Sequence, residues 1–226
     1  MKFGYIVHRG GPFLLASVLL FPGLLAQKSS PPGVHQIAQQ VDRHYNQLHS
    51  LRVAFTESYE GLGIKRAESG TLLLLKPERM RWTYSVPAGK LFLLNGRYAW
   101  FYSEGDPQVQ RIPAKELSDL RSPLRFLLGH TEIEKELDHL TLVPAATGQF
   151  ALTGIPKGQA PGQRLSRLTL TVTTSGAITA IEAEEADGAL TRFTFTGEEP
   201  NAPVSPAEFH FTPPPGVPIV DALPPV

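Results

Sequence analysis

Alternation of apolar and polar residues is the dominant pattern of this chain, and it predicts a protein built mainly of strands. Over residues 165–173, Leu168, Leu170 and Val172 alternate with threonines, as in a strand with one apolar and one hydroxylated face. Further segments with strand-like patterns include residues 53–56, 71–76, 80–84, 91–94, 98–102 and 208–212.

Two dipeptides predict hairpins between neighbouring strands. Asn95-Gly96 and Asp187-Gly188 each separate two apolar runs, and Asn-Gly suits a type I′ turn because both residues tolerate a positive φ. We therefore expect a mainly β fold with some α-helix, in which about ten to eleven strands form an antiparallel sheet. A sheet of that width should curl into an unclosed β-barrel, or half-barrel, with helices covering its concave face.

Helical periodicity appears in three places. Apolar residues recur every three or four positions from Ile37 to Leu51, which predicts an amphipathic helix of about sixteen residues starting near Val34. A second helix is expected from Ser122, its N-cap, to Gly129, with Pro123 in the first turn and Leu124, Leu127 and Leu128 on its apolar face. The spacing of Thr131 and Glu134 predicts a third, short helix running to about Leu137.

The first 26 residues differ from the rest. Lys2, His8 and Arg9 precede an apolar run that ends at Ala26, which is typical of a secretory signal peptide. The run is shorter than the roughly 20 residues that an uncleaved membrane anchor needs. We expect residues 27–226 to be exported as a single domain, and export without cysteine suits a bacterial periplasm.

Composition excludes several classes of function. The 21 basic residues balance 21 acidic ones, so no basic surface predicts nucleic-acid binding, and cysteine is absent, which excludes disulfides and thiolate chemistry. The sequence has no nucleophile elbow, zinc-protease helix, phosphate-binding loop or dinucleotide-binding glycine run. We therefore expect no catalytic residues, no metal site and no cofactor. The proline-rich last 27 residues should form an extended tail over the surface.

Aromatic residues gather on the strands between Trp82 and Tyr102. They either pack the core between sheet and helices or line an apolar cavity on the concave face, and composition does not decide between the two. Alternation predicts these inward-facing cavity residues: Phe55, Leu73, Leu75, Met80, Trp82, Leu91, Leu93, Trp100, Tyr102, Leu168 and Leu170.

Short motifs in order along the chain resemble the periplasmic outer-membrane lipoprotein carriers of the LolA type. They are LRVAFT at residues 51–56, KPERMRW at 76–82, NGRYAWFY at 95–102, Ser122-Pro123, and FHFTPP at 209–214. The resemblance covers nearly all of the expected mature chain. It implies an unclosed barrel whose cavity takes the acyl chains of lipoproteins, with the helix after Ser122 as a lid.

The resemblance also implies partners. A monomeric carrier would receive acylated lipoproteins from an inner-membrane lipoprotein-releasing ABC transporter and pass them to an outer-membrane acceptor. Carriers of another lipid or glycolipid, and envelope-stress regulators that sense lipoproteins, share the fold and remain open as alternatives.

One departure from the family concerns the lid. Lys76 stands where the family often has an arginine that latches the lid, so the latch would be weaker or would lie at Arg79 or Arg81. Met80 stands where the family commonly has phenylalanine, which keeps the site apolar. We expect the lid leucines to fill the cavity and to compete with the lipid for it.

Overall fold

The computed structural model describes residue 1 and residues 32–115, 127, 132–157 and 165–221. The chain divides into two units, residues 1–31 and residues 32–226, and the described helices and strands all belong to the second unit. Apart from Met1, the predicted signal peptide lies outside the described residues.

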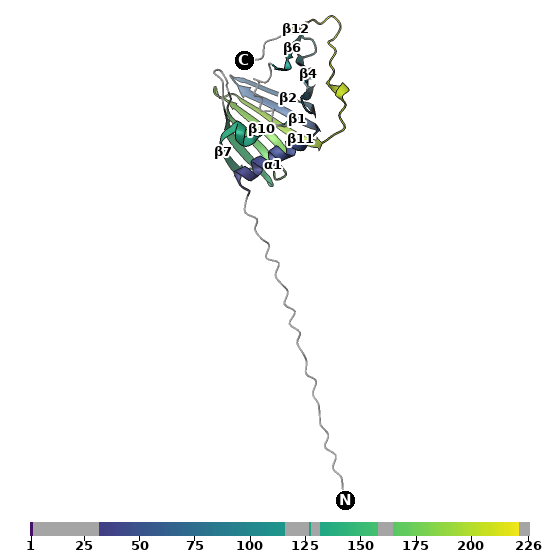
Figure 1. Ribbon diagram of the computed structural model, residues 1–226. Coiled ribbons are helices and arrows are strands. Elements are labelled where there is room, and N and C mark those ends of the chain that lie inside the picture. The colour runs from purple at the N-terminus through teal and green to yellow at the C-terminus, as the bar shows by residue number, and fades with distance from the viewer. Residues whose placement is uncertain (2–31, 116–126, 128–131, 158–164, 222–226) are drawn as a thin grey trace. The chain divides into compact units, whose positions relative to one another are not determined.

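One unclosed sheet dominates the described residues (Figure 1). Its twelve strands lie in the order β12-β6-β5-β4-β3-β2-β1-β11-β10-β9-β8-β7, so β12 and β7 are free edges. Every pairing is antiparallel except that of β12 with β6. The predicted fold class is confirmed, with twelve strands where about ten to eleven were expected. The strands are β1 Ser50–Gly61, β2 Ile64–Leu75, β3 Arg79–Val86, β4 Ala88–Asn95, β5 Tyr98–Tyr102, β6 Val109–Pro113, β7 Leu137–Pro144, β8 Gln149–Pro156, β9 Leu165–Thr173, β10 Ile178–Glu185, β11 Leu190–Pro200 and β12 Ile219–Asp221.

Two helices of the described residues pack together beside this sheet. Helix α1, Val34–Gln47, buries Ile37, Ala38, Val41 and Tyr45, which recur at helical spacing. It ends earlier than predicted, because Leu48 is already extended and Ser50 pairs with Leu75 in the sheet. The short helix expected near residue 131 is present as α3, Ile133–Glu136.

Both predicted hairpins are confirmed, but the expected turn type at Asn95-Gly96 is wrong. Gly96 has a φ of 87°, but the φ of Asn95 is not positive, as a type I′ turn would require. The Asn95 Oδ1 accepts hydrogen bonds from the N–H groups of Arg97 and Tyr98. A turn with two positive φ angles joins β1 and β2 instead, at Leu62 (51°) and Gly63 (77°). Leucine is a poor residue for that conformation, so the sequence did not indicate this turn.

The strand predicted over residues 208–212 is also wrong. Pro206–Phe209 form a 3₁₀ helix, η2, that begins with Pro206 and a capping box between Ser205 and Glu208. The final strand is β12, which pairs in parallel with the edge strand β6. The tail therefore follows the sheet but adds a strand only at its edge.

The core lies on one face of the sheet, which we call the inner face, and the opposite face is the outer face. Figure 1 shows α1 on the inner face, where its buried residues join those of the sheet. This core includes Leu51 and Val53 of β1, Leu72 and Leu74 of β2, Ile181 of β10 and Phe195 of β11. It is continuous from β3 across to β8, as the burial of one sheet face by helices requires.

Candidate ligand-binding face

The inner face carries part of the predicted cavity lining. Phe55, Met80, Trp82, Leu168 and Leu170 are at most 4% exposed and belong to the core that α1 covers. These five side chains therefore face inward, and their role in binding acyl chains stays a prediction.

The inward orientation predicted for six other residues is wrong. Cross-strand partners share a face, and Leu73 is paired through Arg81 and Leu93 to Trp100, all on the side opposite Trp82. Leu75 shares the face of Leu73 by alternation. Leu91 is the partner of Tyr102 in the same outer set. The six outer-face residues are Leu73, Leu75, Leu91, Leu93, Trp100 and Tyr102.

The C-terminal segment explains why the outer face of these strands is apolar. The ring of Phe211 lies 5.8 Å from that of Trp100 and 6.1 Å from that of Tyr102, between ring centroids. The Arg81 guanidinium donates a 2.7 Å hydrogen bond from Nη1 to the Glu208 carbonyl in η2. Because both faces of β3 to β5 carry buried or half-buried apolar residues, alternation along these strands does not distinguish inside from outside.

Aromatic rings form the centre of the inner face. The Phe55 ring packs edge-to-face against Trp82 at 4.5 Å and against Tyr84 at 5.1 Å, and Phe193 lies 5.6 Å from Trp82. No described residue accepts a hydrogen bond from the buried Nε1 of Trp82. Sequence analysis missed Phe193 and Tyr84, although each alternates in phase with a core residue of its own strand.

The three cations proposed as a lid latch separate onto different parts of the fold. The Lys76 ammonium donates a hydrogen bond to the Tyr45 carbonyl, near the C-terminus of α1, and burial lowers the pKa of Lys76. Arg79 and Arg81 alternate with Met80 and Trp82, which places them on the outer face. The outer face is opposite to the one that Leu127 occupies, whereas Lys76 contacts α1. A latch role for any of the three cations stays a prediction.

Further polar contacts fix the C-terminal half of α1. The Tyr45 hydroxyl donates to Glu198 Oε2 at 3.1 Å and accepts from the backbone N–H of Ile178 at 2.9 Å. A 2.6 Å hydrogen bond joins His44 Nε2 to the other oxygen of Glu198. Burial, reinforced by the charge of Glu198, raises the pKa of Tyr45 well above its ordinary value, so the phenol stays protonated and able to donate.

Of the predicted lid helix only Leu127 is described. It is helical, 1% exposed and part of the inner-face core. Pro123, Leu124 and Leu128 lie outside the described residues. One leucine of the predicted lid thus occupies the face where the cavity was expected.

Among the residues described, no group of His, Asp or Glu side chains is placed to hold a metal ion, and no helix is long and apolar enough to cross a membrane. Two hollows of about 440 and 250 Å³ lie at the end of β1 and β2, where both are lined by Ser58, Ala67 and Arg192, and none of these three residues belongs to the core that α1 covers.

The fold and its apolar inner face define the class of protein, and sequence comparison agrees. The sequence pattern of the family described as "Outer membrane lipoprotein carrier protein LolA" matches residues 46–212, and the chain belongs to this family. It is 27% identical over 218 residues to the outer-membrane lipoprotein carrier protein of Sodalis glossinidius, covering 92% of this chain and 97% of that one. The corresponding Proteus mirabilis protein is also 27% identical, over 92% of this chain and 99% of its own length.

A solved structure supports the fold alone. An uncharacterized conserved protein from Thermus thermophilus superposes with a TM-score of 0.53 at 11% identity, over 83% of this chain and 98% of that one.

Proposed function

We propose that this protein is a periplasmic carrier that shields the acyl chains of lipoproteins against the inner face of its sheet and moves them from the inner to the outer membrane. The observation that carries the proposal is the apolar inner face of an unclosed sheet, occupied by helix α1 and by Leu127. Membership in the lipoprotein carrier family supports lipoproteins as the cargo. The role needs no catalytic residue.

Energetics require a competitor for the lipid. Burial of about sixteen carbons at roughly 0.8 kcal/mol per CH₂ releases on the order of 12 kcal/mol, so several chains held that deeply would not leave. If the segment around Leu127 must move aside, the free energy of its displacement is subtracted from the binding free energy. Its return to the inner face then assists release.

The same proposal includes export and partners. Residues 1–26 would direct the chain to the periplasm and be removed, leaving a monomeric single-domain carrier of residues 27–226. An inner-membrane ABC transporter would load it with acylated lipoprotein, and an outer-membrane acceptor would unload it. Lys76 would hold α1 in place against the sheet between these steps through its hydrogen bond to the Tyr45 carbonyl.

A release assay tests the carrier role. The protein, purified after export from cells that express the full chain, is incubated with spheroplasts making a labelled lipoprotein, and the soluble fraction is analysed. We expect a one-to-one complex of lipoprotein and carrier. Bound extracted lipid without released lipoprotein would mean that the protein carries another lipid or glycolipid. Binding of neither would favour a signalling role and refute the proposal.

Two aromatic positions on neighbouring strands offer a matched control for where the lipid binds. Phe92 faces inward, since it is the cross-strand partner of Trp82, whereas Trp100 faces outward. A photo-crosslinking amino acid in place of Phe92 should capture the acyl chains of the labelled lipoprotein. The same amino acid in place of Trp100 should capture little, and equal capture at both positions would refute binding on the inner face.

A further inference from the structure

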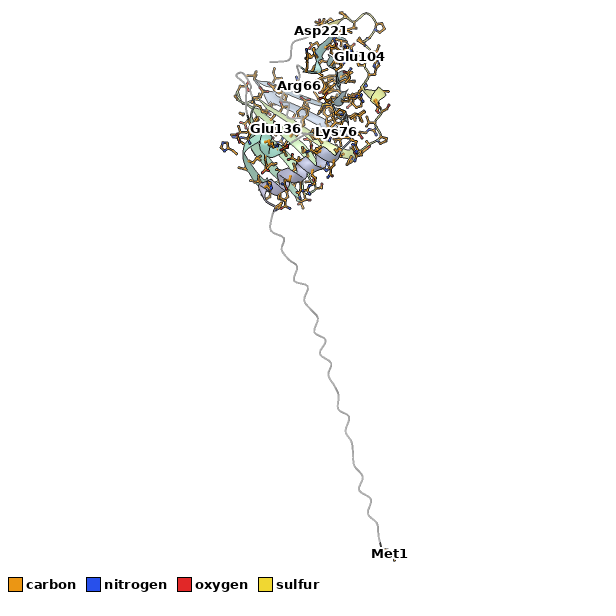
Figure 2. All side chains as sticks on the ribbon, viewed as in Figure 1. Met1, Arg66, Lys76, Glu104, Glu136 and Asp221 are labelled. Carbon is orange, nitrogen blue, oxygen red and sulfur yellow. The ribbon has the colours of Figure 1, made fainter. Side chains whose placement is uncertain are left out.

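Among the described residues, the inner face is covered by α1 at one end and accessible at the other. At the covered end α1 is held by Lys76 and by Ile178 at the start of β10. Toward the β1–β2 hairpin the burial decreases, since Phe55 is 2% exposed while Glu57 and Tyr59 beyond it are half-buried. Arg66 lies near the start of β2 and Lys76 directly follows its end, so the two residues, labelled in Figure 2, lie toward opposite ends of this strand.

Five charged or polar residues lie across the accessible end of the inner face. We call them the collar: Glu57, Arg66, Glu68, Tyr84 and Lys90. Glu57 and Glu68 are cross-strand partners on β1 and β2, and Glu68 is only 6% exposed. The Lys90 ammonium binds Glu68 and lies 4.3 Å from the centre of the Tyr84 ring. Arg66 Nε lies 3.2 Å from the other oxygen of Glu68. The collar thus spans the four strands β1 to β4.

The two carboxylates of the collar differ in their partners. Glu68 binds both cations, whereas the contact of Glu57 is the Tyr84 hydroxyl at 3.4 Å. Burial, followed by repulsion from Glu68, raises the pKa of Glu57. Burial and the two carboxylates also raise the pKa of Tyr84, so its hydroxyl remains a donor at neutral pH. With two acids and two bases the collar is neutral overall but strongly polar.

An acyl chain that covered the collar would remove its charged groups from water, which is unfavourable in free energy. Charged groups left unsolvated against hydrocarbon are strongly unfavourable, so methylene groups should pack below the collar and polar groups at it. From Glu57 to Leu51 the strand spans about 20 Å at roughly 3.4 Å per residue. An acyl chain in a bilayer spans about half of the ~30 Å hydrocarbon core, so the inner face from the collar to Leu51 is long enough for one chain.

We propose that the collar sets the direction of the bound lipid. The acyl chain enters at the β1–β2 and β3–β4 hairpins, its terminal methyl group points toward α1, and its methylenes pack on Trp82 and Phe193. The ester or amide carbonyl that joins the chain to its polar group stops at the collar and accepts a hydrogen bond from Lys90, or from Tyr84 in exchange for its long 3.4 Å bond to Glu57. This inference rests on the proposed function, because it assumes that an acyl chain binds the inner face.

The two tryptophans of the chain allow the direction to be measured. Trp100→Phe leaves the inner-face Trp82 as the only tryptophan, and Trp82→Phe leaves the outer-face Trp100 as a control. Each variant is titrated with a synthetic diacyl lipopeptide brominated in either the carbonyl-proximal or the methyl-proximal third of its chains. Bromine quenches tryptophan fluorescence on contact.

Because Trp82 is two residues below Tyr84, about 7 Å along the strand, the carbonyl-proximal bromines should quench it most. Trp100 should keep its emission with either lipopeptide. Stronger quenching of Trp82 by methyl-proximal bromines, or equal quenching by both, overturns the proposed direction while leaving the carrier function intact. Quenching of Trp82 by neither would refute the carrier function and this inference together.

A second pair of variants tests the collar itself. Tyr84→Phe removes one donor and should weaken lipopeptide binding roughly three- to tenfold, the usual effect of one lost hydrogen bond. Tyr59→Phe, near the hairpin end of β1, should bind the lipopeptide with the affinity of the wild type. Equal affinities for all three proteins overturn the role of Tyr84. A phosphatidylglycerol with the same brominated chains is titrated in parallel, and quenching by it alone would keep the collar but refute lipoprotein as the cargo.

Discussion

The variant Leu127→Ala distinguishes two roles for the segment around Leu127. The segment either competes with lipid for the inner face or only stabilises the fold. The side chain is 1% exposed within the inner-face core. Replacing such a leucine by alanine lowers the free energy of unfolding by about 2 to 5 kcal/mol, from lost burial and the cavity left behind. If Leu127 leaves the core when lipid binds, the whole of this loss falls on the lipid-free state.

The consequence is tighter binding by a less stable protein. Each 1.4 kcal/mol removed from the closed state raises the fraction of open protein about tenfold, until opening no longer limits binding. We therefore expect Leu127→Ala to lower the Kd for a diacyl lipopeptide by at least about tenfold. Titration followed by Trp82 fluorescence gives the affinity, and urea unfolding gives the stability.

Leu152→Ala provides the matched control. Leu152 is 0% exposed in the same core but belongs to strand β8 of the sheet, which is not part of the predicted lid. It should lose comparable stability with no gain in affinity. If Leu127→Ala unfolds more easily yet binds lipopeptide no better than wild type, the segment around Leu127 does not compete with lipid and the reasoning is wrong.

Three further predictions concern α1 and the collar. Lys76→Met removes the bond to the Tyr45 carbonyl and should increase hydrogen exchange in the last turn of α1, with a loss of about 1 kcal/mol; unchanged exchange would contradict the latch. Gly176→Ala, at φ +90°, would place a Cβ 2.3 Å from the Gln40 carbonyl, so stability should fall by at least about 2 kcal/mol in urea; wild-type stability would contradict that contact. The raised pKa of Glu57 means that the folded state binds more protons than the unfolded state just above pH 4.5, so this carboxyl makes the protein less stable as pH rises through that range. Glu57→Gln should remove this component of the pH dependence, and an identical pH profile for both proteins would contradict it.

Local signals were enough for most of the individual elements. The periodicity of Ile37, Val41 and Tyr45 placed α1, and alternation placed β9 to the residue. These patterns succeed because one side of each element is buried and the other is not. The absence of cysteine and the balanced charge likewise follow from the sequence alone.

Local signals failed where distant segments cover both sides of a strand. Leu73, Leu93 and Trp100 are as apolar as the inner-face residues, because Phe211 and η2 pack on the outer side of the same strands. The sequence did not predict the collar either, because Glu57, Glu68 and Lys90 are separated along the chain and match the pattern of ordinary surface charges. Only the pairing of the strands brings them together. In the same way, the Leu62-Gly63 turn follows from the long pairing of β1 with β2 and not from its own residues.

The sequence by itself thus determined the family, the class of fold and the segments that become strands and α1, since these depend on short-range patterns. Only the tertiary structure decided which face of β2 to β5 looks inward, which helix Lys76 holds and where charge crosses the inner face. The physical reason is that burial and pairing between distant strands are set by the whole sheet, and a residue's own neighbours in sequence carry little of that information.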